Sequence, residues 1–103
     1  MTRPRPALRI IFAPLARRRR NEMRVGQADK PNRTIWIDPR VANVGKTLYH
    51  ELTHVRHPDW GEERVEAEED LRWGRMTWKE KARLYQMLGQ AVLEGEEGTN
   101  AGS

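Results

Sequence analysis

Short apolar runs in the first 40 residues of the chain predict β-strands. Residues 8–12 read Leu-Arg-Ile-Ile-Phe and residues 34–38 read Thr-Ile-Trp-Ile-Asp, and both are rich in β-branched and aromatic side chains. Because side chains alternate between the two faces of a strand, Ile35 and Ile37 should share one face and Trp36 should take the other.

A β-hairpin is expected to join the second of these runs to the residues that precede it. Residues 23–27 (Met-Arg-Val-Gly-Gln) are a weaker strand candidate, and residues 28–32 (Ala-Asp-Lys-Pro-Asn) have the composition of a turn. Pairing residues 23–27 with residues 33–37 across that turn predicts two antiparallel strands.

Helical periodicity begins after residue 43. Four apolar residues recur at the spacing of one helical stripe, namely Val44, Leu48, Leu52 and Val55. Asn43 is a suitable N-cap, and Pro58 disfavours helical geometry in the residue before it. The pattern therefore predicts a helix over residues 44–56 that buries this stripe.

A second helix is predicted after a short turn. Asp59 and Glu62 have the spacing of an acidic N-cap followed by a glutamate three residues later. The helix should therefore start near Trp60 and run to Trp73, because Gly74 is a natural C-terminal residue.

The third predicted helix opens with a capping-box signature formed by Thr77 and Glu80. Apolar residues recur after it at helical spacing, which predicts a buried face. The residues expected on that face are Trp78, Ala82, Tyr85, Leu88 and Val92.

These elements predict a small α+β fold. An antiparallel sheet of two to three strands should pack on the helix over residues 44–56, with two further helices beside it. A chain of 103 residues supports one domain, which we expect to span residues 8–93. Residues 1–7 should form a flexible basic arm, and residues 94–103, rich in Gly and Glu, a disordered tail.

The composition excludes several classes of protein. The chain has no cysteine, which excludes a disulfide framework, a thiolate metal site and a cysteine nucleophile. No apolar run approaches the roughly 18 residues of a membrane helix, and the basic amino terminus lacks the apolar centre of a secretory signal. No membrane partner and a cytoplasmic location are therefore expected.

The charge is unevenly distributed along the chain. Residues 1–49 contain 12 basic and 3 acidic residues, a net charge of +9, whereas residues 50–103 contain 7 basic and 12 acidic residues, a net charge of −5. The basic half includes a run of four arginines, Arg17, Arg18, Arg19 and Arg20. This run could contact nucleic-acid phosphates weakly, but a solvated loop is the preferred interpretation, because no base-reading element accompanies it.

His50 and His54 stand four residues apart in the pattern His-Glu-x-x-His. On a helix this spacing places both imidazoles on one face, where they can bind a single Zn²⁺ ion. That face lies nearly opposite the apolar stripe, so it can remain open. Glu51 lies beside the pair and could take a proton from a zinc-activated water.

Catalytic zinc usually takes a third protein ligand. If the turn near Pro58 brings the second helix back across the histidines, Glu62, Glu63 and Glu66 come within range. Glu66 is preferred, because Asp70 one turn later could orient a ligand histidine. Glu63 is the second choice, and Glu62 could be engaged in the helix cap.

His57 is a fourth candidate ligand. It shares the face of His50 and His54 but lies one turn beyond the second ligand. It could reach the metal only if the helix breaks there, which Pro58 permits.

The histidine motif with a downstream glutamate resembles the zincin metallopeptidases, and among them the gluzincins. Residues 34–39, 47–54, 57–59 and 62–66 are together similar to the very small metallopeptidases encoded by phages and prophages. This resemblance covers about residues 34–71. The pentapeptide alone also resembles that of SprT-like and repressor-cleaving domains.

The resemblance implies a zinc metallopeptidase of the cytoplasm, that of the host cell if phage-encoded, which hydrolyses peptide or protein substrates. His50, His54 and Glu66 would be the zinc ligands and Glu51 the general base. An edge strand, here residues 34–38, would bind extended peptide by strand addition. The alternative is a basic nucleic-acid-binding or regulatory module in which the metal only stabilises a small fold.

Overall fold

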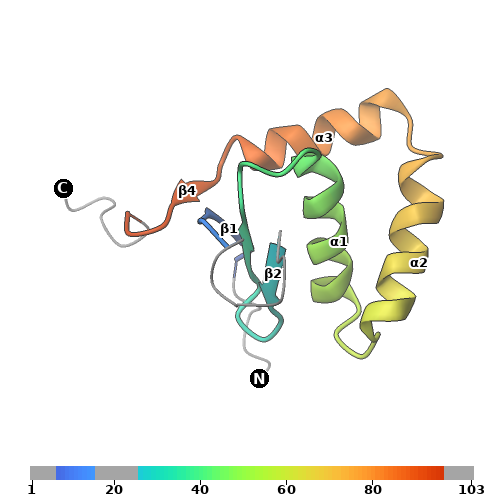
Figure 1. Ribbon diagram of the computed structural model, residues 1–103, viewed down its shortest axis with the longest axis horizontal. Coiled ribbons are helices and arrows are strands. Elements are labelled where there is room, and N and C mark those ends of the chain that lie inside the picture. Colours follow the sequence, from blue (N-terminus) through green and yellow to red (C-terminus); the bar gives the residue numbers. More distant parts are fainter. Residues whose placement is uncertain (1–6, 16–25, 97–103) are drawn as a thin grey trace, which may run out of the picture.

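The computed structural model describes residues 7–15 and 26–96. The predicted arginine run of residues 17–20, most of the predicted amino-terminal arm and most of the predicted tail lie outside this described part. Within it the chain forms three helices and a four-stranded sheet, which confirms the small α+β fold (Figure 1). The elements in chain order are β1 (Arg9–Phe12), β2 (Gly26–Asp29), β3 (Thr34–Ile37), α1 (Val44–Arg56), α2 (Glu62–Trp73), α3 (Trp78–Leu88) and β4 (Val92–Leu93).

The sheet is mixed, not antiparallel as expected, and has four strands in the order β2-β3-β1-β4. β2 and β3 form an antiparallel hairpin as predicted, with Gly26 opposite Ile37. Strand β2 includes Ala28 and Asp29, which were expected in the turn, and residues 23–25 of the predicted strand lie outside the described part. β1, however, pairs with β3 in parallel, and β4 pairs with β1 in parallel. Because β2 occupies one edge of the sheet, the other side of β3 pairs with β1. The strands β1 and β3 run in the same direction.

β3 is a central strand, and the prediction that residues 34–38 form an edge strand was wrong. Ile35 and Ile37 are fully buried and Trp36 is half-buried on the other face, as the alternation predicted. The edge beside α1 is instead β2, which contacts α1 directly. Local alternation identifies a strand and its faces, but it does not say which neighbours the strand acquires.

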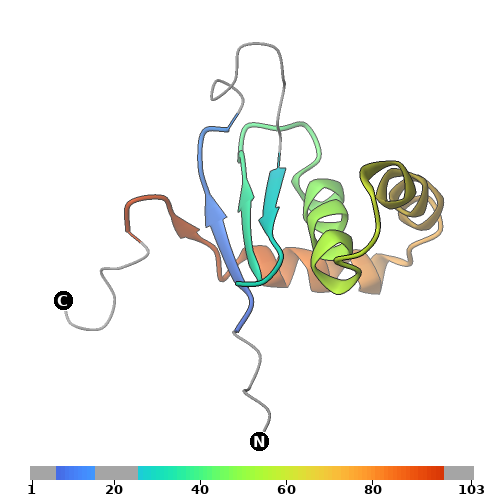
Figure 2. The ribbon, with the colours of Figure 1, turned by 90° about the horizontal axis from the view of Figure 1, so that it is seen from below.

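Helix α1 lies between the sheet and α2, and α3 passes across one end of it (Figures 1 and 2). Its predicted apolar stripe is buried, with Leu48 0%, Leu52 3% and Val55 6% exposed. The core is formed by Ile10, Ile35, Ile37, Leu48, Leu52, Val55 and Leu84. Among the described residues, no helix has both the length and the apolar character needed to cross a bilayer.

Helix α2 begins later than predicted. Its first residue is Glu62 and its N-cap is Gly61, which has no side chain to form a cap hydrogen bond. Asp59 therefore does not cap the helix, and Glu62 is not engaged in a cap.

The capping box of α3 is present as predicted. The hydroxyl of Thr77 accepts a hydrogen bond from the backbone N–H of Glu80, whose carboxylate accepts one from the Thr77 backbone N–H.

The buried face of α3 was predicted correctly only in part: Leu88 packs against the core, whereas Val92 lies in β4. Leu84 is the buried residue of α3, while Trp78 is 75% and Tyr85 52% exposed. The connection from α2 and the packing on α1 set the rotation of α3, and neither is visible in its own periodicity.

Candidate metal centre

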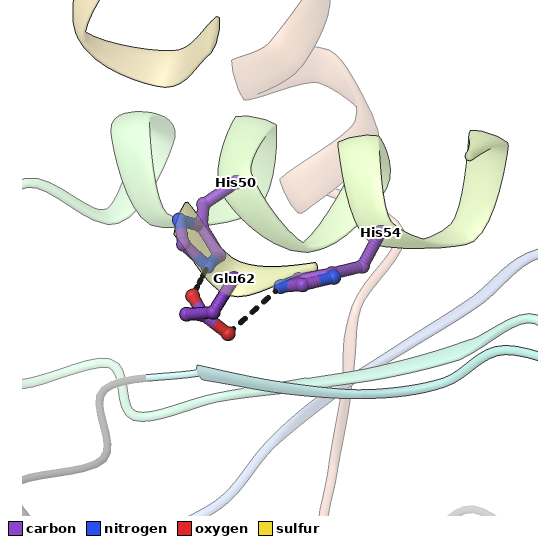
Figure 3. A group of neighbouring side chains, drawn as sticks. All are labelled: His50, His54 and Glu62. Atoms are coloured by element: carbon purple, nitrogen blue, oxygen red, sulfur yellow. Dashed lines mark hydrogen bonds and ion pairs between the residues drawn. The ribbon is translucent and has the colours of Figure 1, made fainter. Parts of the chain in front are cut away.

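Three side chains from two helices converge beside α1 (Figure 3). Nε2 of His50 lies 2.5 Å from one carboxylate oxygen of Glu62, and Nε2 of His54 lies 3.1 Å from the other. One ligand atom from each of the three residues lies within 4.8 Å of the others. The structure therefore brings together two imidazole nitrogens and a carboxylate, a group that could hold a metal ion.

The rotation of α1 explains why both histidines face α2. Leu48, Leu52 and Val55 are buried in the core, which leaves the opposite side of the helix to present residues four apart. The helix has the predicted bounds, because Asn43 caps its start by accepting a hydrogen bond from Lys46 N at 3.0 Å, and it ends at Arg56. The predicted pairing of His50 and His54 on one face is thereby confirmed.

The turn between α1 and α2 positions Glu62 next to His50 and His54. Its backbone closes with a hydrogen bond from Trp60 N to His57 O at 2.9 Å. The ring of Trp60 stacks on that of His57, with centroids 3.8 Å apart, and the guanidinium of Arg64 lies 4.0 Å from the Trp60 ring centroid. This stack fixes the point from which α2 departs, so the first residue of α2 faces the two histidines.

The other predicted third ligands lie elsewhere. Glu66, the preferred ligand, is exposed and is not part of the group, and Glu63 is also exposed. His57 is exposed and stacked on Trp60. Glu62 takes the place expected of Glu66, because Glu62 lies on the face of α2 that turns toward α1, whereas Glu66 lies off that face and is exposed.

Glu69 performs the orienting role that was predicted for Asp70. Its carboxylate lies 2.8 Å from Nδ1 of His50, and both side chains are about 15% exposed or less. Asp70 is 74% exposed and pairs with Lys46 at 3.3 Å. A carboxylate at Nδ1 holds that proton, so that Nε2 of His50 carries the lone pair a metal needs.

The sequence of α2 contains a signal for both Glu62 and Glu69. Val65 is the one buried residue of α2 and the only β-branched residue in it. Glu62 precedes it by three residues and Glu69 follows it by four, so both lie on the face that Val65 buries. Glu66 follows Val65 directly and is rotated about 100° away from that face.

The two histidines have opposite pKa shifts. Burial lowers the pKa of His50, but the hydrogen bond to Glu69 and the negative charges of Glu51, Glu69 and Glu62 together outweigh it, so its pKa lies above the usual value. Burial also lowers the pKa of His54, and there it dominates over the attraction of Glu62. The lowered pKa of His54 favours the neutral form of the imidazole, which is the form that binds metal.

Glu51 lies outside the donor group although it follows His50 directly. It is buried, with 6% of its surface exposed, and its side chain lies against the edge strand β2. A Cβ atom on Gly26 would come within 2.7 Å of Glu51 Oε2 and 2.9 Å of its Cγ. The absence of a side chain at Gly26 therefore leaves the space that this carboxylate occupies.

The donor set fits a divalent metal ion. Two histidine nitrogens and a glutamate oxygen are ligands that zinc and other first-row transition metals accept. Nδ1 of His54 is buried and has no hydrogen-bond partner among the described residues, so no protein group competes for that imidazole apart from Glu62. The chemistry of the group is thus compatible with a divalent cation.

Comparison with protein-family models, with curated proteins and with solved structures gave no match.

Proposed function

We propose that this protein is a zinc-dependent metallopeptidase. One arrangement supports the proposal. His50, His54 and Glu62 converge into a group that could bind a metal ion, while Glu51 lies outside that group and against β2. Two histidines and a glutamate form a ligand set of catalytic zinc sites, in which a fourth position remains for water or substrate.

Each residue near the site would have a separate role in the hydrolysis of a peptide bond. Bound zinc would supply a Lewis acid that polarises the scissile carbonyl and lowers the pKa of a water. Glu51 would accept the proton of the attacking water and later deliver it to the leaving amine nitrogen. Glu69 would keep His50 in the tautomer that presents Nε2. The edge strand β2 would offer backbone groups to an extended peptide.

The substitution Glu51→Gln tests the proposal. It removes the base but none of the three donor residues, so the variant should retain one zinc ion per chain and lose cleavage. The wild type and the variant would be incubated with a peptide library digested from a whole proteome, and new termini would be counted by mass spectrometry. Zinc content would be measured on the same samples by elemental analysis.

Glu63→Gln is the matched control, because Glu63 is an exposed glutamate at the start of α2 outside the donor group. It should cleave and bind zinc like the wild type. A zinc-loaded wild type that cleaves nothing, with Glu51→Gln equally stable and equally loaded, would instead support a metal that only stabilises the fold. Full cleavage by Glu51→Gln would remove Glu51 from the mechanism.

A further inference from the structure

The outer face of α3 exposes two large aromatic side chains. Trp78 is 75% exposed and Tyr85 52% exposed, and they lie seven residues apart, two turns along one face of the helix. Tryptophan is highly buried on average in folded proteins. An exposed pair of aromatic residues on one helix face is therefore a candidate contact surface.

The same segment carries a concentrated positive charge. Residues 72–83 contain five basic residues and one acidic residue, a net charge of +4. The acidic residue, Glu80, is engaged with Thr77 in the capping box. Among the described residues, none forms an ion pair with Arg75, Lys79, Lys81 or Arg83.

Carboxylates on α2 offset only one of these five cations, because Glu68 pairs with Arg72, and residues 75–83 keep a net charge of +3. Glu68 lies 3.5 Å from Arg72, and Asp70 lies 3.3 Å from Lys46. The ammonium of Lys79 lies 5.7 Å from the centroid of the Trp78 ring, so a cation stands beside the exposed indole. The surface thus combines an aromatic face with unpaired cations at close range.

We propose that this surface, the α3 platform (Trp78, Lys79, Lys81 and Tyr85), binds single-stranded nucleic acid. Exposed aromatic rings stack on bases whatever their sequence, and neighbouring lysine and arginine side chains pair with the phosphates. A peptide rich in Asp and Glu would match the cations but would leave the exposed indole without a stacking partner. Charge and aromatic exposure together therefore favour the nucleic acid.

The α3 platform is separate from the metal centre. Tyr85 lies next to the first turn of α1, where a Cβ atom on Gly45 would come within 3.0 Å of its ring and hydroxyl. The histidines lie farther along α1, toward the end at which α1 turns into α2 (Figure 1). Binding at the platform accordingly does not depend on the proposed peptidase activity.

The experiment is a titration of the full chain with a short fluorescein-labelled oligothymidylate, followed by fluorescence anisotropy at several salt concentrations. Trp78→Ala should weaken binding roughly 5- to 100-fold, the range expected for one lost stacking contact. Lys79→Ala combined with Lys81→Ala should reduce the slope of log K against log salt by about 1.4, since each phosphate contact to a single strand contributes about 0.7.

Two exposed residues away from the platform provide matched controls. Leu93→Ala removes an exposed apolar side chain from β4, and Arg56→Ala removes an exposed cation from the end of α1 distant from α3. Both should bind like the wild type, and circular dichroism should show the same helix content in every variant.

The proposal is overturned if Trp78→Ala binds the oligonucleotide as tightly as the wild type. The same conclusion would hold if binding were lost on replacing Arg17, Arg18, Arg19 and Arg20 but kept in Trp78→Ala, because the arginine run would then be the binding site. It is also overturned if poly-glutamate displaces the oligonucleotide from the wild type and binds Trp78→Ala equally well, because the surface would then recognise acidic chains through charge alone.

Discussion

Gly26 and Glu51 are coupled across the gap between β2 and α1, and the coupling gives the first prediction. In Gly26→Ala the new Cβ would stand 2.7 Å from Glu51 Oε2, so the carboxylate must move. A misplacement of about 1 Å in a reacting group can cost on the order of 100-fold in rate. Peptide hydrolysis should therefore fall by about that factor, while zinc affinity changes by no more than about twofold.

Gly74→Ala is the control for this substitution, because a Cβ there meets its nearest atom at 3.8 Å, an ordinary contact. Rates would be measured on a peptide cleaved by the wild type, and zinc affinity by competition with a chromophoric chelator. If Gly26→Ala retained the full rate, the position of the Glu51 carboxylate would not matter for catalysis.

The second prediction at the scale of residues compares three glutamates of α2 for their effect on zinc affinity. Glu69→Ala should weaken zinc binding roughly 10- to 100-fold, the cost of losing a group that orients a ligand histidine. Glu62→Ala should weaken it by more than about 100-fold, since a ligand itself is lost. Glu66→Ala should change it by no more than about twofold, because Glu66 is exposed outside the group.

Competition titrations on the three variants would establish this order. All three substitutions remove one carboxylate from the same helix, so differences in net charge do not contribute to the comparison. A Glu66→Ala variant that bound zinc more weakly than Glu62→Ala would show that the ligand predicted from the sequence is the correct one.

At the scale of elements, α2 is the helix whose position depends most on the metal centre. Val65 is the only buried residue of α2, and the helix carries six acidic and two basic side chains. A cation held by His50, His54 and Glu62 would connect α2 to α1 and offset the repulsion among those acids. In its absence few buried apolar contacts hold the helix in place.

Hydrogen exchange should therefore separate the two helices. On chelation, amides of α2 should exchange faster, while the central amides of α1, which packs against the sheet, should keep their protection. Mass spectrometry with and without zinc would measure this. Equal acceleration in α1 and α2 would mean that the metal stabilises the whole domain as one cooperative unit.

For the whole molecule, metal binding should appear as thermal stability. A free zinc concentration 100 times the Kd stabilises the folded state by about 2.7 kcal/mol. For a domain of this size that corresponds to a rise in Tm of roughly 10–20 °C. Thermal melts followed by circular dichroism, with zinc and with a chelator, would show the difference. Glu62→Ala should show little zinc-dependent shift, and a shift equal to that of the wild type would place the binding site elsewhere.

Short-range features of this chain were predictable from its sequence. Asn43, the apolar stripe and Pro58 determine the bounds of α1, because each acts within one or two helical turns. The pairing of His50 with His54 follows from their spacing on that helix alone. The β2–β3 hairpin and the capping box of α3 are equally local.

Tertiary structure alone decided the features that depend on two elements meeting. The two parallel pairings, of β1 with β3 and of β1 with β4, join strands that lie far apart in sequence. The outward rotation of Trp78 depends on how α3 packs against α1 through Leu84. The choice of Glu62 over Glu66 depends on which face of α2 meets α1, and the stacked turn and the burial of Val65 set that face together. Sequence periodicity determines which residues share a face, whereas packing determines what that face meets.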